Sequence, residues 1–210
     1  MRVLIIGASK GIGLETIRQA LEAGHAVRAF ARSAAEIDIS NSKLEKVPGN
    51  ALKIQDVEAA LIGMDVVIQT LGVGLGDLFR PVRLFSDATR VLIAAMQAQN
   101  VQRLISVTGF GAGDSRANIS CLQRVPFKLV FGRAYEDKSL QEGLIKASSL
   151  DWTIARPGVL TGGRRTARYK ILADAAQWRN GMISRADVAD FLVRQIEDQT
   201  YLRQAPVLIN

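Results

Sequence analysis

The chain has 210 residues, of which 48% are hydrophobic and 22% are charged. This length predicts a single domain, residues 1–210, large enough to bury a full hydrophobic core without disulfides or metals. One cysteine (Cys121) excludes an internal disulfide, and one histidine (His25) argues against a Ser-His-Asp triad and histidine-rich metal sites. We therefore expect no metal.

The balance of 27 basic against 20 acidic residues gives a formal net charge of +7, which favours an anionic ligand. The basic residues are scattered apart from a cluster at Arg164, Arg165, Arg168 and Lys170, and no basic stripe is interleaved with aromatics as in RNA-binding proteins. No charge-free apolar run approaches the ~20 residues of a membrane helix, and the N-terminal apolar run is too short for a signal peptide. We expect a cytoplasmic protein that binds a small molecule rather than nucleic acid or a membrane.

Short apolar runs alternate with helical patterns along the chain. Strand patterns occupy residues 3–6, 26–31, 51–54, 65–70, 103–108, 152–156 and 206–209. Helical spacing occupies residues 12–23, 57–62, 84–99, 134–147 and 186–197. Asp56 is a candidate N-cap for the second helix, and Ser184 or Arg185 for the last. The alternation predicts an α/β fold: a Rossmann-like, doubly wound parallel sheet of about seven strands with helices on both faces.

Two segments interrupt this alternation, residues 109–133 and 158–183. Both follow predicted strands, so both leave the carboxyl edge of the sheet, where doubly wound folds bind ligands. We expect them to line the substrate pocket, the second as a small C-terminal lid.

A glycine-rich loop follows the first predicted strand and opens the first helix. Its spacing, GxxxGxG, is one residue longer in the first gap than the Rossmann pattern GxGxxG. The glycines permit a tight turn, close approach of the backbone to a pyrophosphate, and close packing of the helix on the sheet. The expected cofactor contacts are Gly7, Ser9, Lys10, Gly11, Ile12 and Gly13. The alternative is a glycine-rich turn without a ligand.

The residues after the second predicted strand indicate which dinucleotide binds. NAD sites usually carry an acidic residue there to hold the ribose 2′-OH, but this chain has Arg32 followed by Ser33. A guanidinium can grip a 2′-phosphate that a carboxylate would repel, Lys10 adds a second positive charge, and Ser33 can donate a hydrogen bond. These residues favour NADP(H) as the cofactor; the alternative is that both cations are ordinary solvated charges.

These motifs resemble the short-chain dehydrogenase/reductase superfamily. The likeness is greater to its atypical NAD(P)H-binding branch, which includes NmrA-like proteins and flavin reductase/biliverdin-IXβ reductase. It covers nearly the whole chain. Beyond the glycine loop and Ala31-Arg32-Ser33, it rests on Gln55-Asp56-Val57, Thr70-Leu71-Gly72, Ser106-Val107-Thr108-Gly109, residues 149–158 (SLDWTIARPG) and residues 183–189 (ISRADVA).

The resemblance implies further cofactor contacts. Asp56 would accept a hydrogen bond from the adenine amino group, and Val57 would flank the ring. Leu71 and Gly72 would line the adenosine ribose, and Arg156-Pro157-Gly158 would turn the chain beneath the nicotinamide. Structural roles stand beside these: Asp56 as a helix cap, Val57 as a core residue, and Pro157 as the end of a strand.

The family also implies a catalytic helix. Most short-chain dehydrogenases use YxxxK, in which the tyrosine protonates the substrate oxygen while the lysine lowers its pKa and holds the nicotinamide ribose. Here Lys138 stands on the expected helix, but Ala134 occupies the tyrosine position and Tyr135 lies three residues before Lys138. Positions three and four apart share roughly one side of a helix, so Tyr135 remains a candidate beside its structural alternative. For Lys138, the alternative is an ion pair with Glu142.

A hydroxyl residue completes the predicted site. Thr108 and Ser106 end the fifth predicted strand, and Thr108 is the preferred pocket residue because it lies nearer the carboxyl edge. The missing aligned tyrosine disfavours alcohol oxidation and sugar epimerisation. It is compatible with hydride donation to an acceptor that takes its proton from water.

Other polar and aromatic residues are weaker candidates. We expect a structural or solvated role for His25 and assign none to Cys121. Substrate contacts and ordinary structural roles stay open for Asp114, Ser115, Arg116, Arg164, Arg165, Arg168, Phe110, Phe127, Phe131 and Trp178.

The leading prediction is an NADPH-dependent oxidoreductase that reduces a small planar conjugated acceptor such as a flavin or a quinone. One alternative is a non-catalytic NADP(H) sensor of the NmrA-like type, which the missing tyrosine keeps open. Another is a nucleotide-sugar epimerase or dehydratase, for which the short C-terminal region leaves little room. Monomer and homodimer both remain open.

Overall fold

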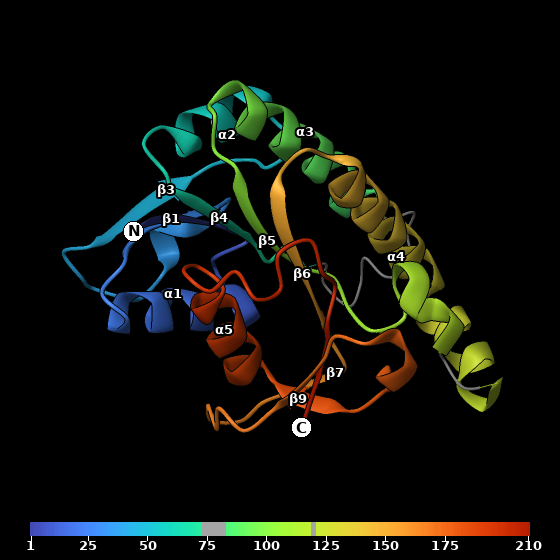
Figure 1. Ribbon diagram of the computed structural model, residues 1–210. Coiled ribbons are helices and arrows are strands. Elements are labelled where there is room, and N and C mark those ends of the chain that lie inside the picture. The colour runs from blue at the N-terminus through green and yellow to red at the C-terminus, as the bar shows by residue number, and fades with distance from the viewer. Residues whose placement is uncertain (73–82, 119–120) are drawn as a thin grey trace.

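The computed structural model describes residues 1–72, 83–118 and 121–210; for residues 121–131 it describes the backbone only. Within them, an eight-stranded sheet runs in the order β3-β2-β1-β4-β5-β6-β10-β8 (Figure 1). Its strands are β1 (Arg2–Ile6), β2 (Ala26–Ala31), β3 (Leu44–Pro48), β4 (Val66–Gln69), β5 (Arg103–Val107), β6 (Asp151–Pro157), β8 (Lys170–Leu172) and β10 (Val207–Ile209). All neighbouring pairs are parallel except β10 with β8, which is antiparallel.

Helices cover both faces of this sheet. They are α1 (Gly11–Glu22), α2 (Ile54–Leu61), α3 (Leu84–Ala98), α4 (Cys121–Ala147) and α5 (Arg185–Arg194). Figure 1 shows α1 and α5 beneath the sheet and α2, α3 and α4 above it. This arrangement confirms the predicted Rossmann-like, doubly wound α/β fold.

The sequence of β1 explains why the sheet is buried on both sides. Val3 and Ile5 pack in the core cluster that includes α1 and α5, whereas Leu4 and Ile6 pack with α2 and α3. Successive side chains of a strand point to opposite faces, so a strand covered on both faces has to be apolar throughout.

The strand order indicates the edge of the sheet at which a ligand would bind. The chain moves from β1 outward to β2 and β3, then returns to β4 on the other side of β1. In doubly wound sheets, ligands bind outside the carboxyl ends of the strands at such a reversal. The residues that follow β1, β2, β4, β5 and β6 therefore form the region to search for a site.

Two predicted elements were wrong, and each has a physical reason. Residues 51–54 do not form the third strand; β3 is Leu44–Pro48, an edge strand with exposed charged residues and no apolar run. The predicted start of the helix at residue 134 is also wrong. Helix α4 begins at Cys121, so much of the segment 109–133 is helical despite Pro126 and Gly132, which disfavour helices.

The predicted helix caps had different outcomes. Asp56 does not cap α2, because the N-cap position is Lys53 and Asp56 lies inside the first turn. Ser184 does cap α5: its Oγ accepts a hydrogen bond from the backbone N–H of Asp187 at 3.0 Å. The predicted strand 152–156 extends one residue further, to Pro157.

The segment 158–183 also contains strands. A separate two-stranded parallel sheet pairs β7 (Val159–Thr161) with β9 (Met182–Ser184), and β8 lies between them in sequence. Within the described parts of the chain, no helix combines the length and apolar character needed to cross a membrane.

Candidate cofactor and substrate site

The glycine loop joins β1 to α1 at the carboxyl edge of the sheet. Gly7 has φ +83°, and a Cβ there would lie 2.9 Å from the carbonyl of Thr70, just after β4. A Cβ at Gly13 would meet the carbonyl oxygen of Gly7 and, at 2.7 Å, Oγ1 of Thr70. These two glycines therefore allow the loop, the helix and β4 to pack closely.

The outer side of the same loop is open. Gly11 has φ +61°, and a Cβ at Gly11 or at Gly72 would meet nothing within 4 Å among the described residues. Lys10 is the N-cap of α1 and makes no side-chain cap hydrogen bond. The first N–H groups of a helix have no intrahelical partner and attract anions, so this loop fits a dinucleotide pyrophosphate.

The remaining loop residues border this opening in sequence. Ser9 and Ile12 are partly exposed, and Ile12 also packs against the core that α1 shares with the sheet. Ser9 and Ile12 therefore combine a structural position with access to the loop surface.

The cations predicted to select NADP(H) are exposed. Arg32 and Lys10 lie on the surface, and neither forms an ion pair within residues 1–72, 83–118 and 121–210. Ser33 is partly exposed and precedes the short 3-10 turn Ala34–Glu36. The charges of Arg32, at the end of β2, and Lys10, after β1, thus have no ion-pair partner among the described residues.

The residues expected to contact the adenosine follow β3 and β4. Asp56 Oδ2 accepts a hydrogen bond from the backbone N–H of Asn50 at 2.9 Å, which closes the loop before α2. Val57 is buried in the core between α2 and the sheet, which agrees with the structural role given above as the alternative to a contact with the adenine ring. Leu71 is partly exposed and packs against the same core.

Three predicted catalytic residues come together between β5 and α4. Thr108 is buried, and the ammonium group of Lys138 donates to its backbone carbonyl at 2.5 Å. The Tyr135 hydroxyl lies beside Gly109, where a Cβ would be 2.7 Å from the phenolic oxygen. Ala134, at the family's tyrosine position, is buried instead. A tyrosine displaced by one position therefore still reaches the end of β5.

The surroundings of Lys138 are apolar. Its Nζ lies 5.1 Å from the ring centroid of Phe85 and 5.4 Å from that of Tyr135. Burial lowers the pKa of Lys138 to about 8, and burial raises the pKa of Tyr135 to about 12. The lysine is thus poised to change its protonation state near neutral pH, whereas the tyrosine stays protonated.

Ser106 is committed to the core. Its hydroxyl donates to Gln69 Oε1 at 3.0 Å, and Gln141 Nε2 donates to Ser106 Oγ at 3.0 Å. This network favours Thr108 over Ser106 as the hydroxyl nearest a ligand.

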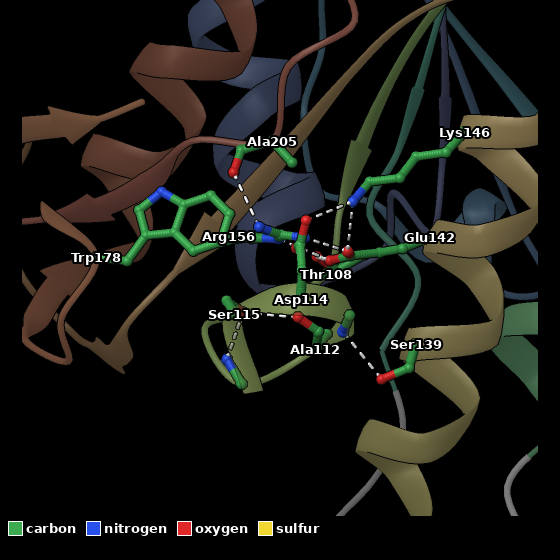
Figure 2. Close-up of polar contacts among 12 residues, drawn as sticks. Thr108, Ala112, Asp114, Ser115, Ser139, Glu142, Lys146, Arg156, Trp178 and Ala205 are labelled. Atoms are coloured by element: carbon green, nitrogen blue, oxygen red, sulfur yellow. Dashed lines mark hydrogen bonds and ion pairs between the residues drawn. The ribbon is translucent and has the colours of Figure 1, made fainter. Parts of the chain in front are cut away.

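An ion cluster with a buried pair at its centre, Arg156 and Glu142, lies beside Thr108 (Figure 2). Thr108 Oγ1 donates to Glu142 Oε1 at 2.7 Å, and Arg156 Nε donates to the same oxygen at 3.0 Å. Arg156 also pairs with Glu142 Oε2 and with Asp114, while Lys146 lies 3.2 Å from Asp114 and 3.8 Å from Glu142. Two cations thus balance two carboxylates, and the Arg156 side chain is 0% exposed.

The pKa values in this cluster reflect the pairing. Burial alone would raise the pKa of Asp114, but Arg156 and Lys146 outweigh it and lower that pKa. Burial alone would lower the pKa of Arg156, but Glu142 and Asp114 outweigh it and raise that pKa. Asp114 and Arg156 therefore both remain charged around neutral pH.

The sequence did not predict this cluster. Glu142 was expected only as an alternative partner of Lys138, whereas it pairs with Arg156 and Lys146. Arg156 was expected only in the turn beneath the nicotinamide. The available signal was a charged residue at the end of the mostly apolar run 152–156, because a buried charge is normally paired.

The two segments expected to line the pocket meet above this cluster. Asn118 Nδ2 donates to the backbone carbonyls of Ala175 and Trp178 at 3.4 and 3.5 Å, and the Trp178 ring lies over Arg156. Phe110 instead packs in a small core with β8 and β10. Ser115 turns inward and donates to the carbonyl of Ala112 at 2.6 Å, whereas Arg116 is exposed.

The end of β6 packs tightly. Pro157 is buried as the last residue of the strand, and a Cβ at Gly158 would meet the carbonyl oxygen of Gly181. Gly158 is therefore required by the close approach of two backbone segments.

The basic part of the segment 158–183 lies elsewhere. Arg165 Nη1 is 3.3 Å from Glu22, the last residue of α1 and therefore far along that helix from the glycine loop. Asp187 of α5 accepts from the backbone N–H groups of Thr166 and Ala167 at 2.7 and 2.9 Å. This placement supports the alternative of a solvated basic loop for Arg165, and Arg164 and Arg168 are likewise exposed.

His25 adds no chemistry to the site. His25 is buried near the N-terminal amine, which lies 3.4 Å from its Nδ1. The side chains of Cys121, Phe127 and Phe131 lie outside the described residues.

Comparison with known proteins assigns the chain to a family. The model of the NAD(P)H-binding family matches residues 7–199. The chain belongs to this family. The match begins at Gly7, in the glycine loop, and it confirms the expected likeness to NAD(P)H-binding proteins.

Three relatives illustrate the likeness. ChuY, an anaerobilin reductase from Escherichia coli O157:H7, is 26% identical with a TM-score of 0.82, over 100% of this chain and 97% of ChuY. A short-chain dehydrogenase/reductase from Veillonella parvula, solved with NADP, has a TM-score of 0.84 over 100% of this chain and 94% of that one. At 17% identity, that likeness shows the fold alone.

The third relative is longer than this chain. Protein TIC 62 of Arabidopsis thaliana, a chloroplastic protein, is 28% identical over 216 residues, which cover 90% of this chain and 32% of TIC 62. The chain thus spans about a third of the length of that relative.

Proposed function

We propose that this protein is an NADPH-dependent reductase that transfers hydride to a small planar conjugated acceptor, such as a flavin or a quinone. The observation that carries the proposal is a convergence at the carboxyl edge of the sheet. The open glycine loop lies at the end of β1, and Thr108, Lys138 and Tyr135 lie together at the end of β5. A dinucleotide with its pyrophosphate on the loop would extend toward these side chains.

The cofactor contacts follow from the placements above. The loop from Gly7 to Gly13 would hold the pyrophosphate, with Ser9 and Ile12 at its surface. Arg32, Ser33 and Lys10 would hold the 2′-phosphate that distinguishes NADPH. The adenosine would lie against Asp56, the backbone of the buried Val57, Leu71 and Gly72, and the nicotinamide above Pro157 and Gly158.

The residues near the reacting atoms have distinct roles. Bound NADPH supplies the hydride, and the acceptor gains that hydride together with a proton from water. Lys138 would hold the nicotinamide ribose through its ammonium group. The Thr108 hydroxyl donates its hydrogen bond to Glu142, so toward a ligand it would offer an oxygen lone pair and act as a hydrogen-bond acceptor.

The chain would work as one domain, with residues 109–133 and 158–183 beside the acceptor. The meeting of these segments at Asn118 and Trp178 supports this arrangement. An enclosed site favours hydride transfer because it excludes competing water. ChuY, a reductase similar over its whole length, supports a reductase rather than a sensor.

The test is NADPH consumption with a panel of flavins, quinones and enones. We expect slow, saturable loss of NADPH absorbance with a planar acceptor, and a lower rate in Thr108→Val. If every acceptor fails while NADP(H) changes the association of the protein with a partner protein, the sensor alternative is correct. Activity confined to a nucleotide sugar would support an epimerase or dehydratase.

A further inference from the structure

Trp178 is held in place from several sides. Its ring centroid lies 4.8 Å from Cζ of Arg156, and its indole N–H donates to the carbonyl of Leu172 at 3.0 Å. Its own backbone carbonyl accepts from Asn118 Nδ2. The side chain is nevertheless partly exposed, so part of this fixed indole faces outward.

The cation beneath the ring is not available to a ligand. Arg156 is buried and its charge is balanced by Glu142 and Asp114, so it cannot act as a receptor for a substrate anion. A guanidinium under an indole instead fixes the ring by cation–π attraction. The indole also packs against the small core of Phe110, Leu172, Val207 and Ile209, and its exposed part offers aromatic surface rather than a charge.

The plane is connected to the proposed reaction site. Thr108 and Arg156 share one carboxylate oxygen of Glu142, and Arg156 lies against Trp178. Figure 2 shows Thr108, Glu142, Arg156 and Trp178 in this continuous arrangement. The indole consequently has a fixed position relative to the hydroxyl at the end of β5.

We infer that Trp178 is the residue on which the planar acceptor stacks, and that it selects for conjugated rings. The inference rests on the proposed function and names a specificity-determining residue for it. Offset stacking on an aromatic ring favours a planar partner beyond the area that it buries. An acceptor without a flat conjugated ring would lose this contribution.

The kinetic test uses duroquinone, a planar quinone whose four methyl groups block addition to the cysteine. Trp178→Leu should raise KM for duroquinone about two- to tenfold, as expected for loss of aromatic stacking, and leave the Kd for NADPH unchanged. Trp178→Phe keeps an aromatic plane and should stay close to the unmodified protein. An unchanged KM in Trp178→Leu would overturn the inference while leaving the reductase proposal intact.

A binding test separates the inference from catalysis. The chain has two tryptophans, and Trp152 is buried in the core, so in Trp152→Phe the only tryptophan is Trp178, which can be excited selectively over the tyrosines. Duroquinone should quench the tryptophan fluorescence of this protein saturably, and should not saturably quench that of Trp178→Phe, whose only tryptophan is Trp152. Saturable quenching of Trp178 without turnover of any acceptor in the panel would support the stacking site and contradict the reductase proposal. Equal, non-saturating quenching of both proteins would overturn the stacking site.

Discussion

Glu142 offers the sharpest test of the buried ion cluster. The substitution Glu142→Gln keeps the size of the side chain but removes the charge that faces Arg156 and Lys146. Arg156 would keep Asp114 as a partner, but that carboxylate is largely exposed and replaces neither contact made by Glu142. Removing one partner of a buried ion pair typically costs about 3–5 kcal/mol.

This loss is large enough to measure by thermal unfolding. In proteins of this size, each kcal/mol lowers Tm by about 2–4 °C, so Glu142→Gln should lower Tm by roughly 6–20 °C. The matched control is Glu136→Gln, which makes the same change at an exposed position of α4 and should stay within about 0.5 kcal/mol.

A double-mutant cycle shows whether the loss comes from the pair. Combining Glu142→Gln with Arg156→Met removes both charges, so the double variant should lose less stability than the sum of the single variants. Equal Tm values for Glu142→Gln and Glu136→Gln, or strict additivity in the cycle, would refute the reasoning.

The cofactor site gives three further predictions. NADPH should bind at least about tenfold more tightly than NADH, because a charge-assisted hydrogen bond contributes ~1.5–3 kcal/mol. Arg32→Ala should reduce this preference in fluorescence titrations, and equal affinities in the unmodified protein or an unchanged preference in Arg32→Ala would contradict the assignment. NADPH affinity should fall as pH rises through about 8, where Lys138 loses its proton, and in Lys138→Arg the affinity should not change over this pH range. Tyr135→Phe should lower NADPH binding and turnover less than Lys138→Ala does. Gly13→Ala should cost about 1–3 kcal/mol of unfolding free energy and weaken NADPH binding. Gly143→Ala, where the added Cβ meets open space, should change neither the stability nor the binding. Similar behaviour of the two variants would contradict the packing argument.

The sequence predicted the parts of the fold that local chemistry determines. The apolar residues of β1, the glycine loop and the cap at Ser184 each depend on neighbours within a few positions, so their patterns are visible in the chain. Edge strand β3 was missed because only part of it is covered and charged residues interrupt its apolar residues. The apolar residues at 51–54 instead lead into α2.

The candidate site was only partly predictable for a related reason. Thr108, Lys138 and Tyr135 were named from a motif, but their contacts depend on how α4 packs against β5. Arg156 pairs with carboxylates 14 and 42 positions away, and no local pattern reports such contacts. The stacking of Trp178 on Arg156 likewise appears only once the two strand-following segments meet.

The most direct test of the central claim is a single-turnover reaction under anaerobic conditions. The protein is mixed with duroquinone and with NADPH that carries deuterium at the transferred position of its nicotinamide ring. Direct hydride transfer predicts that NADPH oxidation is slower with deuterium than with hydrogen at that position. If the protein binds NADPH but oxidises neither form with duroquinone or any flavin, it is not the reductase proposed here.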